Sequence, residues 1–466
     1  MSMTRAGVGA ARRADVIGLR HIVPGLISDP LRAFEEIGAR SGGRVVRLDL
    51  GPFRPYLVTR PEHVAHVLRD NGANYRRDGM MWRPLRRLFG DGLGGEGAEW
   101  EPSRRLVQPL FSSRHIGRLL AAMADEIAAA VDELAGRRGR VVDAEQAMTR
   151  IVHAVLVRIF FGGRLSIADA ERLGRAVATA FTSMAARMLL PFAPASVPLP
   201  GDRAFRAAVR TADEILFPLV RQIRARPDAE ATDIVSLLCR ATDTDGRRLS
   251  DQRVRDDIVA IFAAGTETTA VALTWLWVVL RANPDVARRL RREVDEVVGA
   301  GPARPEHLPG LRYARMVFSE LLRLYPIGWV IPRTAAADDT IDGVRVRGGS
   351  TVILSPYLTQ RLPDVWRDPT RFDPERFAPA RENQRPRFAY FPFSGGAHAC
   401  LGGHLSTVEA QLVAGTMLAR FRPRVRGDPP APRAAVSLRP DSRVQLVLRP
   451  APVSRASSPP PGRSPG

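Results

Sequence analysis

The sequence predicts a mainly α-helical fold with small β-sheets, built around one long central helix. Ala-rich stretches with helical apolar periodicity dominate residues 117–225. A long apolar segment with helix start and stop signals covers residues 250–282, whereas strand-like alternation is confined to short runs near 44–59 and 340–355. A chain of 466 residues is long enough to bury a large core and an internal cavity.

The expected elements follow the chain in order. Residues 44–59 alternate around Gly51-Pro52 and predict a hairpin, and residues 340–355 predict short antiparallel strands around Asp342-Gly343. The longest helix begins after Ser250, a favourable N-cap, and ends before Asn283-Pro284. The other helices are predicted near 117–136, 143–161, 167–189, 203–225, 311–325 and 401–421, with a proline-rich loop at 191–200.

No linker is long enough to divide two globular units. We therefore expect one domain over residues 21–448, which follows a flexible N-terminal segment at 1–20. Residues 449–466 are rich in Pro and Ser and are expected to be a disordered tail.

The charge balance is strongly basic, but it does not indicate nucleic-acid binding. The 69 basic residues exceed the 49 acidic ones by 20, and every basic residue is Arg. These arginines are spread along the chain and aromatic residues are only 6% of it, whereas nucleic-acid surfaces combine clustered cations with aromatic platforms. A basic face that attracts an acidic electron-transfer protein is the better interpretation.

Neither a signal peptide nor a membrane anchor is expected. Residues 1–20 carry four arginines and no continuous apolar run. Ile258–Leu280 is long enough to span a bilayer, but it contains Glu267 and four threonines, so a buried central helix is expected. The protein is predicted to be a soluble, cytoplasmic monomer.

Two cysteines occur in the chain, and they point in different directions. Two thiols build neither a disulfide framework nor a four-cysteine metal centre. Cys239 has the apolar spacing of an ordinary core residue. Cys400 follows a glycine-rich loop and precedes a helix, where backbone N–H groups and the helix dipole favour a thiolate.

The Cys400 loop carries a resemblance to a known family. Residues 393–402 match Phe-x-x-Gly-x-Arg/His-x-Cys-x-Gly, and in this they resemble the cytochrome P450 family of haem-thiolate monooxygenases. The resemblance implies haem b with Cys400 as the axial iron ligand, and places Phe393, Gly396 and Gly402 around it. A thiolate ligand favours O–O cleavage and hence oxidation of unactivated C–H bonds.

A second motif lies within the long helix. Ala264-Gly265-Thr266-Glu267-Thr268 matches the family's oxygen-activation segment, which implies room for O2 beside Ala264 and proton supply by Glu267 and Thr268. The alternative is an ordinary helix whose threonines bond back to carbonyls.

Other matches concern the haem carboxylates and the scaffold. By resemblance, Trp100, Arg104, Arg333 and His398 hold the haem propionates, which need forked cationic donors. The Glu320-x-x-Arg323 pair and Arg376 match a buried charge triad with a structural role. Taken alone, each of these residues is more typical of an ordinary surface position.

The substrate wall is expected in segments 74–95, 178–200, 260–268, 327–331 and 437–440, which are mostly apolar and favour an apolar small molecule. The residues predicted to line it are Met80, Trp82, Phe181, Met184, Ile327, Trp329, Val330 and Leu438.

The predicted function is insertion of one oxygen atom from O2 into a secondary metabolite such as a sesquiterpenoid or other terpenoid. This substrate rests on a likeness of residues 191–200 and 354–361 to actinobacterial terpene-oxidising members of the family. Polyketide, macrolide or fatty-acid hydroxylation remains the alternative. A peroxide-driven peroxygenase or a haem sensor would not need Glu267-Thr268. The chain has no segment for a flavin or nicotinamide, so electrons are expected from NAD(P)H through a separate ferredoxin and its reductase.

Overall fold

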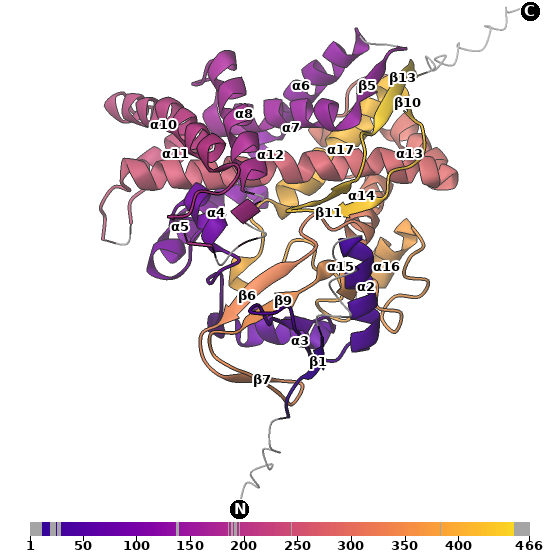
Figure 1. Ribbon diagram of the computed structural model, residues 1–466. Helices are drawn as coiled ribbons and strands as arrows, with labels where there is room; N and C mark the ends of the chain where they lie inside the picture. Colours follow the sequence, from indigo (N-terminus) through magenta and orange to yellow (C-terminus); the bar gives the residue numbers. More distant parts are fainter. Residues whose placement is uncertain are drawn as a thin grey trace, which may run out of the picture.

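A computed structural model describes residues 12–18, 25, 29–136, 139–184, 186, 187, 190, 193, 194, 196–243, 245–382 and 384–451. Helices dominate the fold and small sheets complete it, which confirms the predicted class (Figure 1). The helices are α2 (Pro30–Ser41), α3 (Pro61–Ala65), α4 (Arg83–Phe89), α5 (Trp100–Val107), α6 (Ser113–Ala135), α7 (Ala144–Phe161), α8 (Ile167–Ser183), α10 (Asp202–Ala225), α11 (Ile234–Arg240), α12 (Asp251–Ala282), α13 (Pro284–Val297), α14 (Arg312–Leu324), α15 (Pro356–Thr359), α16 (Pro379–Glu382) and α17 (Gly403–Arg420).

The strands form one larger sheet and three small ones. The largest sheet has the order β1-β2-β3-β9-β6-β4, the second β10-β13-β5, and the pairs β11-β12 and β7-β8 stand alone. The strands are β1 (Asp15–Ile17), β2 (Val46–Leu48), β3 (Tyr56–Val58), β4 (Tyr75–Arg76), β5 (Val141–Asp143), β6 (Ile331–Ala335), β7 (Asp339–Ile341), β8 (Val344–Val346), β9 (Thr351–Leu354), β10 (Phe421–Arg426), β11 (Pro432–Ala434), β12 (Leu438–Pro440) and β13 (Gln445–Pro450).

Both predicted hairpins are confirmed. Strand β2 pairs antiparallel with β3, and β7 pairs antiparallel with β8 across Asp342-Gly343. Strand β9 differs from its expected role, because it leaves the hairpin and joins the larger sheet, parallel to β3 and antiparallel to β6. This sheet and α3 lie apart from the main helical group in Figure 1.

The ends of the chain are described only in part. Within the segment expected to be flexible, β1 pairs parallel with β2, while residues 1–11, 19 and 20 lie outside the described residues. At the other end, residues 449 and 450 complete β13, and residues 452–466 lie outside them too.

The central helix α12 is confirmed at the predicted bounds. The Ser250 hydroxyl accepts a hydrogen bond from the Arg253 N–H at 3.1 Å, and Pro284 starts α13 directly after Asn283. The 32 residues of α12 span about 48 Å at about 1.5 Å per residue, so the helix crosses the helical part of the molecule (Figure 1). Among the described residues it alone is long and apolar enough to cross a membrane, but 72% of its apolar window is buried inside the protein.

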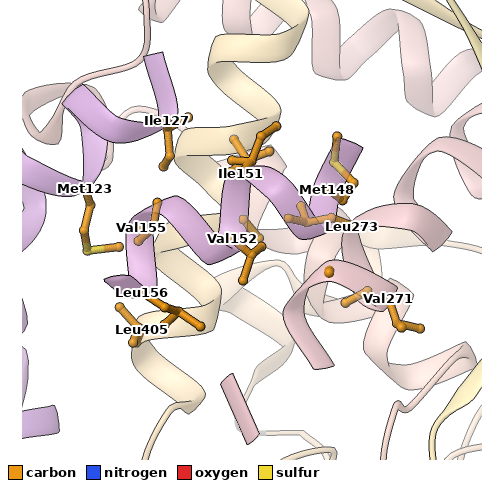
Figure 2. Close-up of a cluster of buried hydrophobic side chains, with 14 of the residues drawn as sticks. Met123, Ile127, Met148, Ile151, Val152, Val155, Leu156, Val271, Leu273 and Leu405 are labelled. Carbon is orange, nitrogen blue, oxygen red and sulfur yellow. The ribbon is translucent and has the colours of Figure 1, made fainter. Parts of the chain in front are cut away.

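The main core forms where α6, α7, α12 and α17 meet (Figure 2). Met123 and Ile127 of α6 and Val152 and Val155 of α7 are fully buried there, with Leu273 of α12. Helix α6 starts four residues before the predicted position, because Ser112 caps it by accepting from the His115 N–H. This core fixes α12 and α17 beside one another and thereby sets the two walls of the cavity described next.

Candidate active site

A cavity of about 400 Å³ lies between α12 and the loop that precedes α17. Its wall is mostly apolar and comes from the region before α5, from α7, α12 and α17, and from the segment leading into β6. The apolar lining residues include Trp82, Phe89, Leu93, Leu156, Phe160, Ile261, Ile327, Ile331, Phe393 and Leu405.

Three residues at the centre of the protein are exposed, and each of them lines this cavity. They are Ala264 and Thr268 of α12 and Cys400 of the loop. Their neighbours in α12, Ala263 and Thr269, are buried. The exposed surface of Cys400 therefore faces an interior space, and the protein otherwise encloses the thiol.

Backbone contacts hold the Cys400 loop in place. The Cys400 N–H donates to the Phe393 carbonyl at 2.8 Å, and a short 3₁₀ turn (η7, Gly396–His398) precedes the cysteine. Gly396 has φ +67°, and a Cβ there would lie 1.7 Å from the Leu68 carbonyl oxygen, so only glycine allows this close approach. A Cβ at Gly403 would lie 3.2 Å from the Phe393 ring, which packs across the start of α17.

The thiol of Cys400 sits among opposing influences. Burial raises its pKa, while N–H groups of Gly402 and Gly403 and the charge of Arg104 lower it. These donors favour the thiolate once a cation, such as a metal ion, compensates for burial. No other group of three or more His, Cys, Asp or Glu side chains that would hold a metal occurs in the described part of the chain.

On α12, the Thr268 hydroxyl lines the cavity and donates to the Ala264 carbonyl at 2.7 Å. The back-bonded threonine of the alternative interpretation is thus present, and the same hydroxyl is available to a molecule in the cavity. Glu267 is not among the described residues that line the cavity. Its carboxylate accepts from Ser437 Oγ at 2.8 Å and from Arg439 Nη2 at 2.7 Å, because the segment around β12 packs against α12.

A cluster of cations lies at one edge of the cavity. Arg77, Arg104 and His398 line it, and Arg333 is 3% exposed close to Arg77. Burial lowers the pKa of Arg77 to about 10 and that of Arg333 to about 9, and each of these two guanidinium groups lowers the other further or feels a neighbouring arginine. Such buried like charges are stable only beside an anion.

Glu96 is the one carboxylate that faces this cation cluster within the described residues. It accepts from the Arg77 N–H at 2.5 Å and pairs with His398 Nε2 at 3.2 Å. Burial opposes its ionisation, but the bonds from His398 and Arg77 lower the pKa of Glu96 to about 2. One carboxylate leaves the three arginines undercompensated.

Two buried donors of the cluster lack a partner within the described residues. They are Arg77 Nε and His398 Nδ1. The rings of His398 and Trp100 lie 4.0 Å apart, so the imidazole is fixed by packing and by Glu96. Free cationic donors beside a cavity with a thiol in its wall fit a flat macrocycle that carries a metal ion and peripheral carboxylates.

The predicted charge triad assembles behind the cysteine loop. Glu320 and Arg323 are fully buried and form a bidentate pair at 2.7 and 2.8 Å, and Arg376 Nε lies 3.4 Å from Glu320. Glu320 also accepts from the Asp373 N–H, and Arg323 donates to the carbonyls of residues 360, 369 and 371. These bonds tie α14 to the segment before the cysteine loop.

The predicted substrate wall needs correction. Trp82 and Ile327 line the cavity, whereas the six other predicted residues are not among the described residues that line it. These six are Met80, Phe181, Met184, Trp329, Val330 and Leu438.

Packing explains several of these positions. Phe181 lies behind the lining residue Phe89 in an edge-to-face contact at 5.9 Å, and Met184 is core. Trp329 packs on Phe34 and donates to the Ala435 carbonyl, while Leu438 is fully buried. Residues 185, 188, 189, 191, 192 and 195 of the predicted segment 178–200 lie outside the described residues.

Sequence reasoning missed two polar lining residues, Arg77 and Glu409. Arg77 follows a two-residue strand and has no local pattern that would separate it from the other arginines. Glu409 did carry a signal, since it stands between Val408 and Ala410 in an otherwise apolar stretch of α17.

Comparison with known proteins adds the following. The sequence profile of the family described as Cytochrome P450 matches residues 30–448. The chain is 31% identical to the pentalenene oxygenase of Streptomyces avermitilis, over 86% of this chain and 88% of that protein. It is 32% identical to the cyclooctatin synthase of Streptomyces melanosporofaciens, over 85% and 86%. It is also 32% identical to the cyclooctat-9-en-7-ol 5-monooxygenase of that organism, over 82% and 83%.

Solved structures agree in fold. The crystal structure of the cytochrome P450DA heme domain superposes with a TM-score of 0.84 at 23% identity, over 94% of this chain and 98% of that one. A mutant of the same domain gives the same TM-score.

Proposed function

Because the chain belongs to the cytochrome P450 family and is a monooxygenase of it, we propose that it binds haem b through Cys400 and oxidises an apolar terpenoid. One observation carries the haem assignment. The only three exposed residues noted above at the centre of the protein, Cys400, Ala264 and Thr268, face one cavity, and the unpartnered donors of Arg77 and His398 lie at its edge.

The residues divide the work of binding. Cys400 provides the thiolate, and Arg77, Arg104, Arg333 and His398 provide donors for two propionates. The ring of Trp100 fixes His398, and Gly396 lets the loop approach the rest of the protein closely. When bound, a thiolate-ligated haem supplies activation of O2 for insertion into C–H bonds.

The distal wall supplies position and protons. Ala264 and Gly265 carry no bulky side chain, and a Cβ on Gly265 would press on Leu156 at 3.1 Å. The Thr268 hydroxyl is the polar group that α12 presents at this point, and Glu267 is the neighbouring acid that the family resemblance assigns to proton supply. Apolar walls keep bulk water away from the reacting oxygen.

The apolar wall and the relatives support a terpenoid substrate. Trp82, Phe89, Phe160, Ile261 and Ile327 offer shape and few polar anchors. The cations in the described wall belong to the edge assigned to the propionates, which leaves no counter-charge for a fatty-acid carboxylate. The names of the relatives given above refer to terpenoids.

Electron supply comes from outside the chain in this proposal. NAD(P)H would deliver two electrons per turnover through a ferredoxin reductase and a ferredoxin to a monomeric, cytoplasmic enzyme. The excess of 20 positive charges favours encounter with an acidic ferredoxin.

Ligand-induced shifts of the haem absorption band test the substrate. Pentalenene should displace the haem-bound water signal, whereas a macrolide and a long-chain fatty acid should not. Turnover with O2, a surrogate ferredoxin and its reductase should then give a hydroxylated product. A shift with the fatty acid alone would overturn the terpenoid assignment, and product with peroxide but none with electron supply would overturn the oxygenase mechanism.

A further inference from the structure

Glu409 is a buried acid without a counter-charge. It lies on α17, is 1% exposed, and its Oε1 has no hydrogen-bond partner among the described residues. No described cation pairs with it, in contrast to Glu320, which is held by two arginines. An unpaired buried carboxyl is costly, so its presence needs a reason.

The carboxyl belongs to the wall of the active-site cavity. Glu409 lines this cavity together with Ser406 and Thr269. Ser406 precedes Glu409 by three residues and so lies on the same face of α17. The Thr269 hydroxyl donates to Ser406 Oγ at 3.2 Å, which links α17 to α12 directly after Thr268. Polar groups therefore run from Glu409 to the oxygen-binding part of the cavity.

The acid of the α12 motif is placed differently. The Glu267 carboxylate is occupied by Ser437 and Arg439 and does not line the cavity within the described chain. An ion-paired carboxylate holds no proton to give until that pair opens. Glu409 has no such pair to open.

We propose that Glu409 is a second proton-donating acid for oxygen activation, acting through Ser406 and Thr269 beside Thr268. The proposal rests on the haem site inferred above. Insertion of one oxygen atom follows RH + O2 + 2 e⁻ + 2 H⁺ → ROH + H2O, so each turnover consumes two protons at the oxygen. The electrons come from the external NAD(P)H-dependent reductant.

The transfer balances as a relay of hydroxyls. The Glu409 O–H bond breaks as Ser406 Oγ takes the proton, Ser406 passes its own proton to Thr269, and Thr269 passes one to the oxygen. Hydroxyl hydrogens rotate, so the bond that now runs from Thr269 to Ser406 can reverse. A bridging water would complete the step between Glu409 and Ser406, where no direct bond exists. The resulting carboxylate regains a proton from water that enters when product leaves.

The protonation state agrees with this role. Burial raises the pKa of Glu409 to about 8, so the carboxyl holds a proton at neutral pH. No charged group of the described chain contributes to this shift, and burial is its whole cause. A donor whose pKa is near the working pH gives and regains a proton readily.

Infrared spectroscopy of the purified holoenzyme tests the stored proton without turnover. The spectrum at pH 7 should contain a carboxylic C=O band that moves in heavy water and disappears in Glu409→Gln. A difference spectrum between wild type and Glu409→Gln that shows no such band would refute the proposal.

Coupling tests the relay. With pentalenene, NADPH and surrogate redox partners, Glu409→Gln and Ser406→Ala should each lower product per NADPH by about five-fold or more and raise peroxide release in proportion. Thr407→Ala is the matched control, because its hydroxyl lies on the same helix and bonds back to the Gly403 carbonyl. Unchanged coupling in Glu409→Gln would overturn the proposal.

The two proposals fail in different ways. If wild type does not oxidise pentalenene, the substrate assignment is wrong, and the infrared band still decides whether Glu409 stores a proton. If the wild type gives tight coupling and Glu409→Gln gives the same, Glu267 alone supplies both protons.

Discussion

At the scale of single residues, Arg77 and Arg333 are buried cations whose charge the protein itself does not balance. Burial lowers the pKa of both, and Arg77 Nε lacks a partner within the described residues. A protein tolerates such groups where a ligand completes them. The haem propionates have the charge and the geometry to do so.

Replacing Arg77 should therefore weaken haem retention. Hydrogen bonds to a charged group contribute about 1.5–3 kcal/mol, so Arg77→Gln should speed haem loss by roughly 10-fold or more. Transfer of haem to excess apomyoglobin measures this rate. Arg175→Gln is the control, because Arg175 is exposed and pairs only with Glu171. Equal rates for both variants would contradict the propionate assignment.

Glu409 should leave a signature in the pH dependence of stability. Its folded pKa of about 8 lies above the model value of 4.5, so the native state keeps a proton that the unfolded chain releases. The free energy of unfolding should thus fall as pH rises from about 4.5 to 8. Glu409→Gln removes this loss, and its stability relative to wild type should rise by about 3 kcal/mol between pH 4.5 and 7.

Urea unfolding of both proteins across this pH range measures the difference. A constant difference at every pH would mean that Glu409 does not hold a raised pKa in the folded protein.

Residue-level prediction from sequence succeeded where chemistry is written in a local pattern. Cys400, Thr268 and Arg104 stand in short motifs, and each lines the cavity. Arg77 gave no such signal, because its role depends on Glu96 and His398, which are distant in the sequence. The side chain of Glu267 also escaped sequence reasoning, since its partners come from residues 437 and 439.

At the scale of elements, α14 is fixed by buried charge. Glu320 faces Arg323 and Arg376, and the burial that raises the pKa of Glu320 is offset by these arginines and by the Asp373 N–H. Removing one member of such a group leaves the others uncompensated in the interior.

Glu320→Gln should accordingly destabilise the protein by about 3–5 kcal/mol. The control is Glu36→Gln, which breaks an exposed pair with Arg32 and should change stability by less than about 0.5 kcal/mol. Denaturant unfolding at pH 7 measures both. A loss of similar size in the two variants would show that the buried group is not a structural lock.

The helices were more predictable than the sheets. Ser250 and Asn283-Pro284 bracket α12 with caps that are readable in the sequence. Strand β9 could be found as a strand, but its partners β3 and β6 could not, because the parallel pairing with β3 joins residues about 300 positions apart. The turns of Trp329 and Val330 away from the cavity follow from that same sheet.

At the scale of the whole molecule, charge should govern reduction by a partner protein. An excess of 20 positive charges attracts an acidic ferredoxin over distances that salt screens. The rate of reduction by such a ferredoxin should fall several-fold as ionic strength rises from about 0.05 to 0.5 M. Stopped-flow reduction measures it, and a rate that is independent of salt would contradict charge-steered docking.

The whole account depends on a thiolate from Cys400 reaching a haem in the central cavity. The difference spectrum of the reduced protein with carbon monoxide tests this most directly. We predict the band of thiolate-ligated haem in wild type and its loss in Cys400→Ser. A band of histidine-ligated haem in the wild type, or a thiolate band that survives in Cys400→Ser, would contradict it.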